Sequence, residues 1–566
     1  MRALASIALA LCASIGCSGK TTAEDEGEDE LPPDPKGWTI DVDLAGTDRF
    51  VQPVDSATWP VAGVARASDG VASVTIAGAD APLDADGAFA ADVALPMTPG
   101  LTPVAIRVTD ASGHVRKADR TLLASRFLAD GEHNTKAASL VLDNALLASM
   151  SSGIAGQAAD VNVAAEILAR PYLSQDSQCA TWPVQARQGT VAVELKQDQG
   201  NLWLHIRVPN LYVYFEGECQ GLLRMIPLAG EMAGTIDIWT RLTPKASGAT
   251  CLTAFDHTTP QVTIAGWQFG VWGTGGPLQN WMVDAFSGSK KQEAHDQLVG
   301  QVGQKANQML GAKLANISVF DKTSTLDLLG KQVAMHLCLG GLDKVGSTLV
   351  ARIAAQASGA GTREAPGTPQ IDGAVPQVPA KELLLDANLV GQLLFAAWKD
   401  GGMSRAAPDT DISVLQILVP ALQDHFSTSM AQITVDAELP PVVTATPMGP
   451  SDLKVELGDL MVDISLEGTR VFRFGVNLTL LLDLVPMAGK LVPTVIETSS
   501  KVVLLDELYD GPDDALETAI GVKIGGTAAE LLGTSTAIAL PDLPGLGAPA
   551  AVTPDAGGRF LRVMLQ

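Results

Sequence analysis

The fold is decided by three stretches in the C-terminal third: Glu382-Leu-Leu-Leu-Asp-Ala-Asn-Leu-Val-Gly-Gln-Leu-Leu-Phe-Ala-Ala-Trp-Lys-Asp-Gly-Gly402, Ile417-Leu-Val-Pro-Ala-Leu422 and Leu439-Pro-Pro-Val-Val443. Four apolar residues of the first stretch recur at helical steps, namely Leu385, Leu389, Leu393 and Trp398. This spacing predicts a helix with a wide apolar face, which the two glycines close. A short turn containing proline and the entry to a sheet follow.

The remainder of this region predicts long, curved strands and a further helix. Apolar residues alternate through residues 453–466, with a phase slip at Gly458-Asp459 of the kind that a β-bulge produces. Residues 472–484 are apolar at every second position, which predicts a strand much longer than the usual five or six residues. Residues 513–532 are predicted to be helical, and a last strand lies near the C-terminus.

An earlier region repeats this order of elements. Residues 133–153 are predicted to form a long helix, with Asn134 as its N-cap. Period-2 strands follow, and then a second helix over residues 292–314. Its apolar stripe contains Leu298, Val302, Met309 and Leu310. The Gly- and Pro-rich residues 358–380 are interpreted as the linker between the two regions.

The region before these two differs in pattern. Residues 38–126 contain short alternating strands about ten residues apart, separated by Asp-Gly and Ser-Gly turns. This spacing predicts an all-β sandwich. The order of its strand and turn motifs resembles bacterial immunoglobulin-like repeats of surface proteins.

The succession of motifs from residue 127 to the C-terminus resembles the tubular lipid-binding family, to which bactericidal/permeability-increasing protein, lipopolysaccharide-binding protein and cholesteryl ester transfer protein belong. The motifs that resemble those of the family lie in the second region, at residues 388–402, 418–420, 440–442 and 540–541. The resemblance implies an α+β fold with two tandem elongated barrels, each a twisted sheet on a long helix, at residues 127–357 and 381–566. It also implies acyl chains held between helix and sheet.

Candidate residues for lining the two slots are Leu142, Leu146, Met150 and Met309 in the first barrel, and Leu389, Leu393, Phe395 and Trp398 in the second. The competing interpretation is a filled core, because an apolar stripe more often packs against protein than against a ligand. The expected ligand is a phospholipid or fatty acid, since each methylene group removed from water gains about 0.8 kcal/mol.

The N-terminus predicts export. Arg2 and an apolar run precede Cys17, as in a lipoprotein signal peptide over residues 1–16, with ordinary cleavage near the same point as the alternative. Ser18 follows the pattern of retention in the outer membrane. Residues 17–37 are acidic and then proline-rich, which predicts a disordered tether. We expect a monomeric outer-membrane lipoprotein that faces the periplasm or the cell surface.

The formal net charge of -25 argues against nucleic acid and against capture of anionic head groups, because both need basic patches. No run after the signal peptide reaches the roughly 18 apolar residues that a membrane helix needs. The remaining cysteines lie in one region: Cys179, Cys219, Cys251 and Cys338. They predict two disulfides with three possible pairings. Metal binding is disfavoured because no CxxC motif and no histidine near in sequence completes a zinc set.

No motif predicts catalysis. The seven histidines are far apart, and HExxH, Gly-x-Ser-x-Gly and phosphate-binding loops are missing from the sequence. We therefore expect a lipid-binding or lipid-transfer protein with no cofactor, no metal and no catalytic residue. Two alternatives stay open. One is a non-enzymatic surface scaffold with filled barrels, whose immunoglobulin-like region binds a protein partner, and the other is a hydrolase with a site assembled across the barrels.

Overall fold

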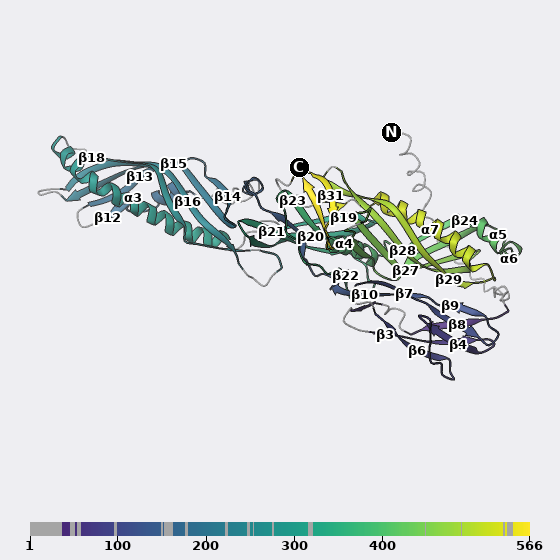
Figure 1. Cartoon of the computed structure of the whole chain (residues 1–566). Helices are drawn as coiled ribbons and strands as arrows, with labels where there is room; N and C mark the ends of the chain where they lie inside the picture. The colour runs from purple at the N-terminus through teal and green to yellow at the C-terminus, as the bar shows by residue number, and fades with distance from the viewer. Residues whose placement is uncertain are drawn as a thin grey trace, which may run out of the picture.

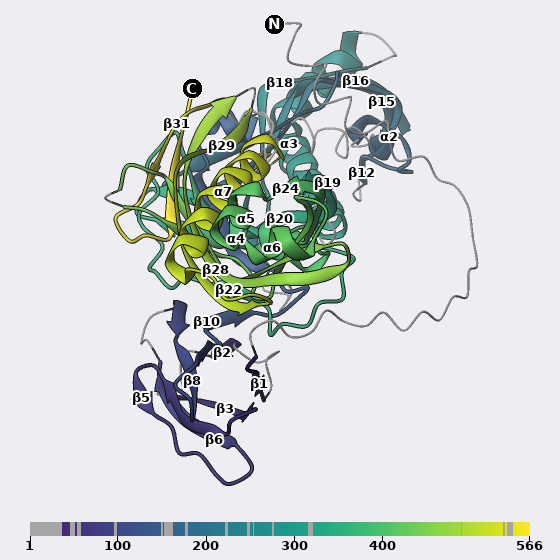
Figure 2. The ribbon, with the colours of Figure 1, turned by 90° about the vertical axis from the view of Figure 1, so that its right-hand side faces the viewer.

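The computed structural model describes residues 37–45, 51–53, 58–95, 99–148, 151, 162–175, 179–220, 225–245, 250–252, 254–273, 277–314, 321–447, 449–487, 489–535, 538–539 and 547–566. Strands predominate and a few helices accompany them, so the predicted α+β class is confirmed. The molecule is elongated, and the N-terminal strands lie beside its C-terminal half (Figure 1). Seen along the long axis, these strands form a separate lobe (Figure 2).

The N-terminal lobe consists of short strands in small sheets. The sheets have the orders β1-β3-β6, β5-β4-β8-β9 and β2-β10-β22, with β7 paired to β10. The strands are β1 (Ile40–Leu44), β2 (Val51–Pro53), β3 (Thr58–Ala67), β4 (Val71–Ile76), β5 (Ala79–Asp80), β6 (Ala88–Ala94), β7 (Gly100–Val104), β8 (Ile106–Asp110), β9 (Val115–Lys117), β10 (Arg120–Leu128) and β22 (Thr368–Gln370). β22 lies within the stretch interpreted as a linker, and it pairs with the end of β10.

One end of the molecule is a sheet of long antiparallel strands with the order β12-β13-β15-β16-β17, in which β14 pairs with β15 and β18 with β16. The strands are β12 (Ser174–Gln175), β13 (Cys179–Arg187), β14 (Ala192–Asp198), β15 (Asn201–Gln220), β16 (Met225–Pro244), β17 (Phe255–His257) and β18 (Gln261–Gly273). The helix α2 (Val163–Leu168) packs on β13 and β15, and α3 (Pro277–Leu314) packs on β18, β16 and β17.

A central sheet combines strands from most of the chain, in the order β19-β20-β21-β11-β23-β32-β31. Its strands are β11 (Asn134–Val141), β19 (Asp321–Leu328), β20 (Lys331–Val345), β21 (Thr348–Ser358), β23 (Glu382–Asp386), β31 (Pro549–Pro554) and β32 (Phe560–Leu565). α4 (Ala387–Lys399) packs against β20 and β21 of this sheet.

The prediction of a helix over residues 133–153 was wrong for its first half. Residues 134–141 form β11, and only residues 144–148 and 151 are helical in the described part of this stretch. β11 pairs with β21 on one side and β23 on the other, and residues 137–140 are all buried. A strand buried on both faces has a continuous apolar run, which periodicity does not distinguish from a buried helix.

The opposite end is a second sheet, with the order β24-β25-β27-β28-β29-β30 and β26 paired to β27. Its strands are β24 (Arg405–Asp411), β25 (Met430–Ala437), β26 (Val442–Ala445), β27 (Leu453–Leu466), β28 (Thr469–Met487), β29 (Lys490–Glu507) and β30 (Ile538–Ala539). The register of β27 against β28 shifts between Leu457 and Leu460, so the predicted bulge at Gly458-Asp459 is confirmed, as is the long strand β28. α5 (Ser413–Leu418), α6 (Ala421–His425) and α7 (Asp513–Ser535) complete this end.

Two long helices lie against these end sheets. α3 packs along β18, and α7 packs along β29 and β28. Each predicted barrel requires a sheet that wraps around a long helix. In the described part of the chain no long helix is enclosed by a sheet, so the two barrels are not established. One continuous apolar core nevertheless runs through both end sheets and the central sheet.

The N-terminal lobe contacts the C-terminal half through charges of opposite sign. The lobe supplies the cations Arg116, Lys117 and Arg120, and β27, β29 and α7 supply the anions. The ion pairs are Arg116–Asp506, Lys117–Asp513 (2.7 Å), Lys117–Glu517 (2.9 Å) and Arg120–Asp459 (2.6 Å). The backbone N–H of Thr121 also donates to Asp459, at 3.1 Å. The contact is therefore held both by ion pairs and by a backbone hydrogen bond.

Asp459 should make the free energy of unfolding depend on pH. Burial raises the pKa of Asp459 to about 6, although Arg120 opposes that rise. Between about pH 4 and pH 6 the folded chain binds a proton that the unfolded chain does not, so stability falls as pH rises through this window. Relative to the usual aspartate pKa of about 3.9, this rise corresponds to about 3 kcal/mol of stability.

The measurement is urea unfolding of the wild type and Asp459→Asn at pH 4, 5, 6 and 7. We expect the difference in unfolding free energy between the two proteins to change by about 3 kcal/mol across the series. Asp41→Asn, which removes an exposed carboxylate from β1, controls for the loss of one charge. A pH-independent difference between wild type and Asp459→Asn would show that the assignment to Asp459 is wrong.

Candidate functional site

A cavity of about 230 Å³ lies between α2, α3 and strand β16, and we call it the α2–α3 cavity. Its apolar lining comes from all three elements: Ile167, Ile238, Leu298, Val302, Ala306 and Met309. Polar groups also border it, and they are Asn162, Glu166, Arg170, Gln301 and Lys305. The cavity therefore combines an apolar interior with charged groups of both signs.

The sequence of α3 explains how the helix can face a cavity. Leu298, Val302, Ala306 and Leu310 recur every four residues and are at most 6% exposed. Residues four apart lie on one face of a helix, so this stripe points toward the sheet. Ala306 has the smallest side chain of the four, and Val302 and Ala306 both line the cavity. From residue 298 to residue 309 the cavity follows α3 for about 16 Å.

α2 covers the cavity and is held in place by polar contacts. The side chain of Asn162 caps the helix by accepting from Ala165 N–H at 2.9 Å, and Ala164 N–H donates to Gln188 at 2.9 Å. Glu166 on α2 forms an ion pair with Lys305 on α3, with 3.0 Å between Oε1 and Nζ. Both side chains are partly exposed, so this pair contributes at most about 1 kcal/mol and can open at small cost.

The sequence-predicted residues of the first slot separate in the structure. Met309 lines the α2–α3 cavity. Leu142 and Leu146 are buried in the common core, at 4% and 6% exposed, and neither lines this cavity. Met150 and the predicted lipidation site Cys17 lie outside the described residues.

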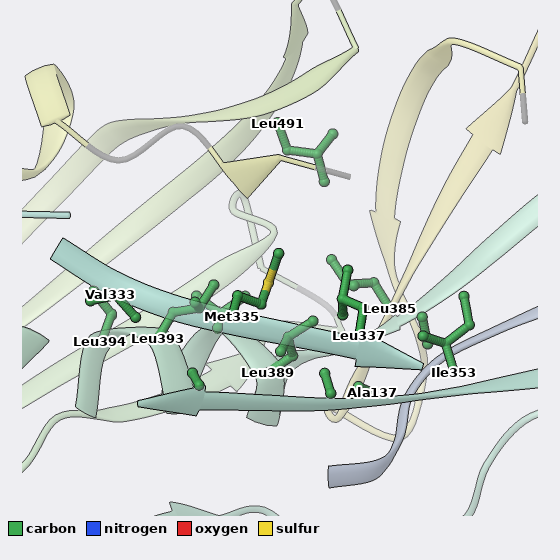
Figure 3. Packing of buried hydrophobic residues seen from close by; sticks show 14 of the residues in the cluster. Ala137, Val333, Met335, Leu337, Ile353, Leu385, Leu389, Leu393, Leu394 and Leu491 are labelled. Carbon is green, nitrogen blue, oxygen red and sulfur yellow. The ribbon is translucent and has the colours of Figure 1, made fainter. Parts of the chain in front are cut away.

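The four residues predicted for the second slot all lie on α4, and all are buried. Leu389, Leu393, Phe395 and Trp398 are between 2% and 4% exposed. Figure 3 shows Leu389 and Leu393 packed toward Val333, Met335 and Leu337 of β20. Every residue from Ala387 to Trp398 is buried, so this helix is surrounded by protein on all sides.

Sequence reasoning missed α2 and therefore the residues on one side of the cavity. Glu166 and Ile167 lie about 130–140 residues before the residues of α3 that line the same cavity. A usable signal was present, because Asn162 is a favoured N-cap and precedes Ala164 and Ile167 at helical spacing. A helix of six residues falls below the length at which periodicity alone is informative.

The two predicted disulfides are confirmed, and their pairing is now defined. Cys179 bonds to Cys219, its direct cross-strand partner on β15, and Cys251 bonds to Cys338 on β20. Such bonds persist in oxidising surroundings, which indicates an extracellular or periplasmic location. Among the described helices, none has the length and apolar character to cross a membrane.

Two groups of side chains within the described residues have the donor atoms and the proximity for a metal ion. One is Asp69, Asp110 and His114, and the other is His133, Cys251 and His336. In the first group Asp110 already accepts from the backbone N–H of Ser112 and His114 and contacts the His114 ring. Burial acts to raise the pKa of Asp110, but these bonds together hold that pKa below its usual value. Asp110 is therefore occupied in closing the β8–β9 turn.

Comparisons with known proteins give structural neighbours at low similarity. No family model matches the chain, and no curated protein matches it. A lipopolysaccharide binding protein is 12% identical with a TM-score of 0.36, covering 77% of this chain and 99% of that chain. P47 of Clostridium botulinum E1 is 8% identical with a TM-score of 0.22, covering 77% and 100%. A tetra-tandem repeat of a large adhesion protein is 11% identical with a TM-score of 0.12, covering 82% and 99%. These TM-scores do not establish a shared fold, so the function is inferred from the residues themselves.

Proposed function

We propose that the protein binds lipid by holding an acyl chain in the α2–α3 cavity. The observation that carries the proposal is the apolar space between the stripe of α3 and strand β16. A methylene group transferred from water into such a space gains about 0.8 kcal/mol. The volume of about 230 Å³ is slightly smaller than common ligand pockets of roughly 300–1,000 Å³, which supports one acyl chain rather than a two-chain lipid.

The polar border supports a ligand with one polar end. Glu166 and Lys305 form a partly exposed pair, and Arg170 also borders the cavity. A head group placed there meets both signs of charge. Since the whole chain has a net charge of -25, a zwitterionic or neutral head group is favoured over an anionic one.

The wider proposal is a lipid carrier built from two elongated barrels and anchored by a lipidated Cys17 to the outer membrane. α3 and α7 each lie along an end sheet of long strands, which is the pairing of elements that such barrels need. The second unit would then hold lipid between α7 and β29. Transfer of lipid between membranes is part of this proposal.

One observation favours a second function, a surface scaffold without ligand. The four predicted slot residues on α4 are packed inside the core, as expected of a filled unit. A scaffold of this kind would use the N-terminal lobe to bind a protein partner. The lipid measurement below separates the two functions.

Filling the α2–α3 cavity should remove bound lipid. Ala306→Phe adds a ring where α3 faces the cavity, whereas Ala312→Phe adds the same ring at an exposed position of the same helix. The protein is purified from a bacterial host, and native mass spectrometry measures discrete added masses. We expect such masses in the wild type and in Ala312→Phe, and at least a tenfold lower lipid-bound fraction in Ala306→Phe.

Two results would contradict the proposal. Lipid retained equally by Ala306→Phe and Ala312→Phe would place the ligand elsewhere in the molecule. A protein without added mass, even after incubation with phospholipids and fatty acids, would favour the scaffold. Far-UV circular dichroism of both variants checks that the added ring has not unfolded the first end sheet.

A further inference from the structure

A cluster of two histidines, a carboxylate and a disulfide lies where the loop before β11 meets β19 and β20. His133 Nε2 is 3.0 Å from His336 Nδ1, and His336 Nε2 is 2.7 Å from Asp321 Oδ1. Cys251 Sγ is 4.0 Å from His133 Nε2, and Cys251 is bonded to Cys338. The proposed lipid function uses none of these groups.

The carboxylate fixes the orientation of one imidazole. Asp321 accepts from His336 Nε2–H, which leaves His336 Nδ1 directed at the facing nitrogen of His133. A carboxylate that binds the far nitrogen of a histidine is the usual outer partner of a metal-ligating imidazole. Zinc–nitrogen bonds are about 2.0–2.1 Å, so two nitrogens about 3 Å apart can share one ion after a small displacement.

The disulfide lies beside His133, because Cys251 Sγ is 4.0 Å from His133 Nε2 and is bonded to Cys338 Sγ. Cys338 is two residues from His336 on β20, so both side chains project from the same face of the strand. Cys251 is held against β20 because the next residue, Leu252, donates its N–H to the Leu339 carbonyl at 2.6 Å. This backbone bond does not depend on the disulfide. The loop therefore keeps Cys251 near the histidines when the disulfide opens.

We propose that reduction of the Cys251–Cys338 disulfide creates a zinc site whose ligands are His133, His336, Cys251 and Cys338. Two imidazoles and two thiolates are a common tetrahedral set for Zn²⁺, and soft sulfur ligands exclude Mg²⁺ and Ca²⁺. The disulfide form lacks thiolates and offers only the two imidazoles. The oxidation state of this bond thus decides whether the site has two ligands or four.

The chemistry balances with a dithiol as the reductant. Two electrons and two protons pass from the dithiol to the Cys251–Cys338 bond, which becomes two thiols while the dithiol becomes a disulfide. Zn²⁺ then displaces the two thiol protons. The resulting centre carries no net charge, since two thiolates balance the ion and both imidazoles are neutral. A neutral centre is compatible with the buried position of Cys338, which is 1% exposed.

The test uses Co²⁺ as a spectroscopic probe for zinc in the full chain. Cys179→Ser/Cys219→Ser is the background, so that Cys251–Cys338 is the disulfide that responds. The protein is examined before and after reduction by a phosphine, and Co²⁺ and Zn²⁺ are titrated into each form. We expect one Co²⁺ per reduced chain, with tetrahedral d–d bands and a thiolate-to-cobalt charge-transfer band, and displacement of Co²⁺ by Zn²⁺.

Substitutions test the ligands one by one. His133→Ala and His336→Ala should each weaken Co²⁺ binding at least tenfold, and Asp321→Asn should weaken it about 10- to 100-fold. His257→Ala is the matched control, because His257 contacts Asn307 and lies outside the cluster. It should leave the titration unchanged. Far-UV circular dichroism of the reduced variants checks that each is folded.

Three results would overturn the proposal. The first is a folded, reduced chain without a thiolate-to-cobalt band. The second is a band of equal affinity in His133→Ala and His336→Ala, which would mean that the thiols bind cobalt without the histidines. The third is equal Co²⁺ affinity of the oxidised and reduced forms, which would rule out control by the disulfide.

Discussion

Replacing Arg559 with methionine should lower the free energy of unfolding by about 3–5 kcal/mol. Arg559 Nη2 lies 2.6 Å from Asp386 Oδ2, and the side chain of Asp386 is fully buried. Asp386 also accepts from the backbone N–H of Asn388 at 3.0 Å, which caps α4, and from the Asn134 side chain at 3.2 Å. One carboxylate thus connects β11, α4 and the start of β32.

The large effect comes from the charge that is left behind. Methionine keeps most of the aliphatic stem, so packing changes little, but the Asp386 carboxylate loses its cation in a site without water access. Breaking a buried pair by removing one partner is costly for this reason. Asp386→Asn combined with Arg559→Met should recover part of the loss, since it removes the uncompensated charge.

Arg562→Met is the matched control, because Arg562 lies on β32 and is three residues from Arg559. Arg562 contacts Glu382 and Asp555 at 3.3 Å, and its side chain is 29% exposed. We expect a loss of less than about 1 kcal/mol. Urea unfolding monitored by far-UV circular dichroism measures all variants. Similar losses for Arg559→Met and Arg562→Met would contradict the role given to burial.

Replacing Trp398 with alanine should cost about 3–5 kcal/mol. Trp398 is 2% exposed, its ring lies beside Phe395, and its Nε1–H donates to the Ala437 carbonyl at 2.8 Å. Alanine leaves a cavity and removes one of the two side-chain hydrogen bonds that the Ala437 carbonyl accepts, while Arg363 still donates the other. Trp398→Phe keeps most of the volume and removes one hydrogen bond, so we expect a smaller loss of about 0.5–1.5 kcal/mol.

The control for Trp398 is Trp272→Ala on β18, where the tryptophan is 40% exposed. A surface substitution of this kind should change stability by less than about 1 kcal/mol. Denaturant titration gives the stabilities, and native mass spectrometry of the same samples gives the lipid content. If Trp398→Ala were stable but lost bound lipid, Trp398 would line a ligand slot, and its description as core would be wrong.

Elements with strong local patterns could be predicted from the sequence. The bulge at Gly458-Asp459 changes the phase of alternation in a visible way, and β28 alternates over its whole length. The start of α7 at Asp513 was also predicted correctly. Each of these depends on residues close together in the chain, and such residues are what a periodicity measures.

Features that depend on distant residues could not be predicted. β11 pairs with β21 along one edge and with β23 along the other, and residues 137–140 are all buried, so its apolar run resembled a helix. The stretch that opens at Glu382 looked helical throughout, but residues 382–386 form β23 in the central sheet. Among the predicted slot residues that the structure describes, Met309 alone lines the α2–α3 cavity.

The grouping of the histidines with the cysteines could not be predicted from the sequence for the same reason. His133 lies 118 residues before Cys251, and His336 lies 203 residues after His133. No spacing rule joins positions this far apart. Pairing of β19 with β20 and closure of the Cys251–Cys338 bond bring them together. The candidate ligands of the proposed zinc site can be grouped only when the arrangement of the strands is known.

The order of strands in the central sheet has a consequence for synthesis of the chain. β11 is synthesised first, but one of its edges stays unpaired until β23 is made, and β23 in turn lacks a partner on its other edge until β32 is made, which is much later in the chain. Until β32 is made, the growing chain carries an open strand edge that other chains could pair with. The two halves therefore cannot finish folding one after the other, because β32 completes the central sheet that they share.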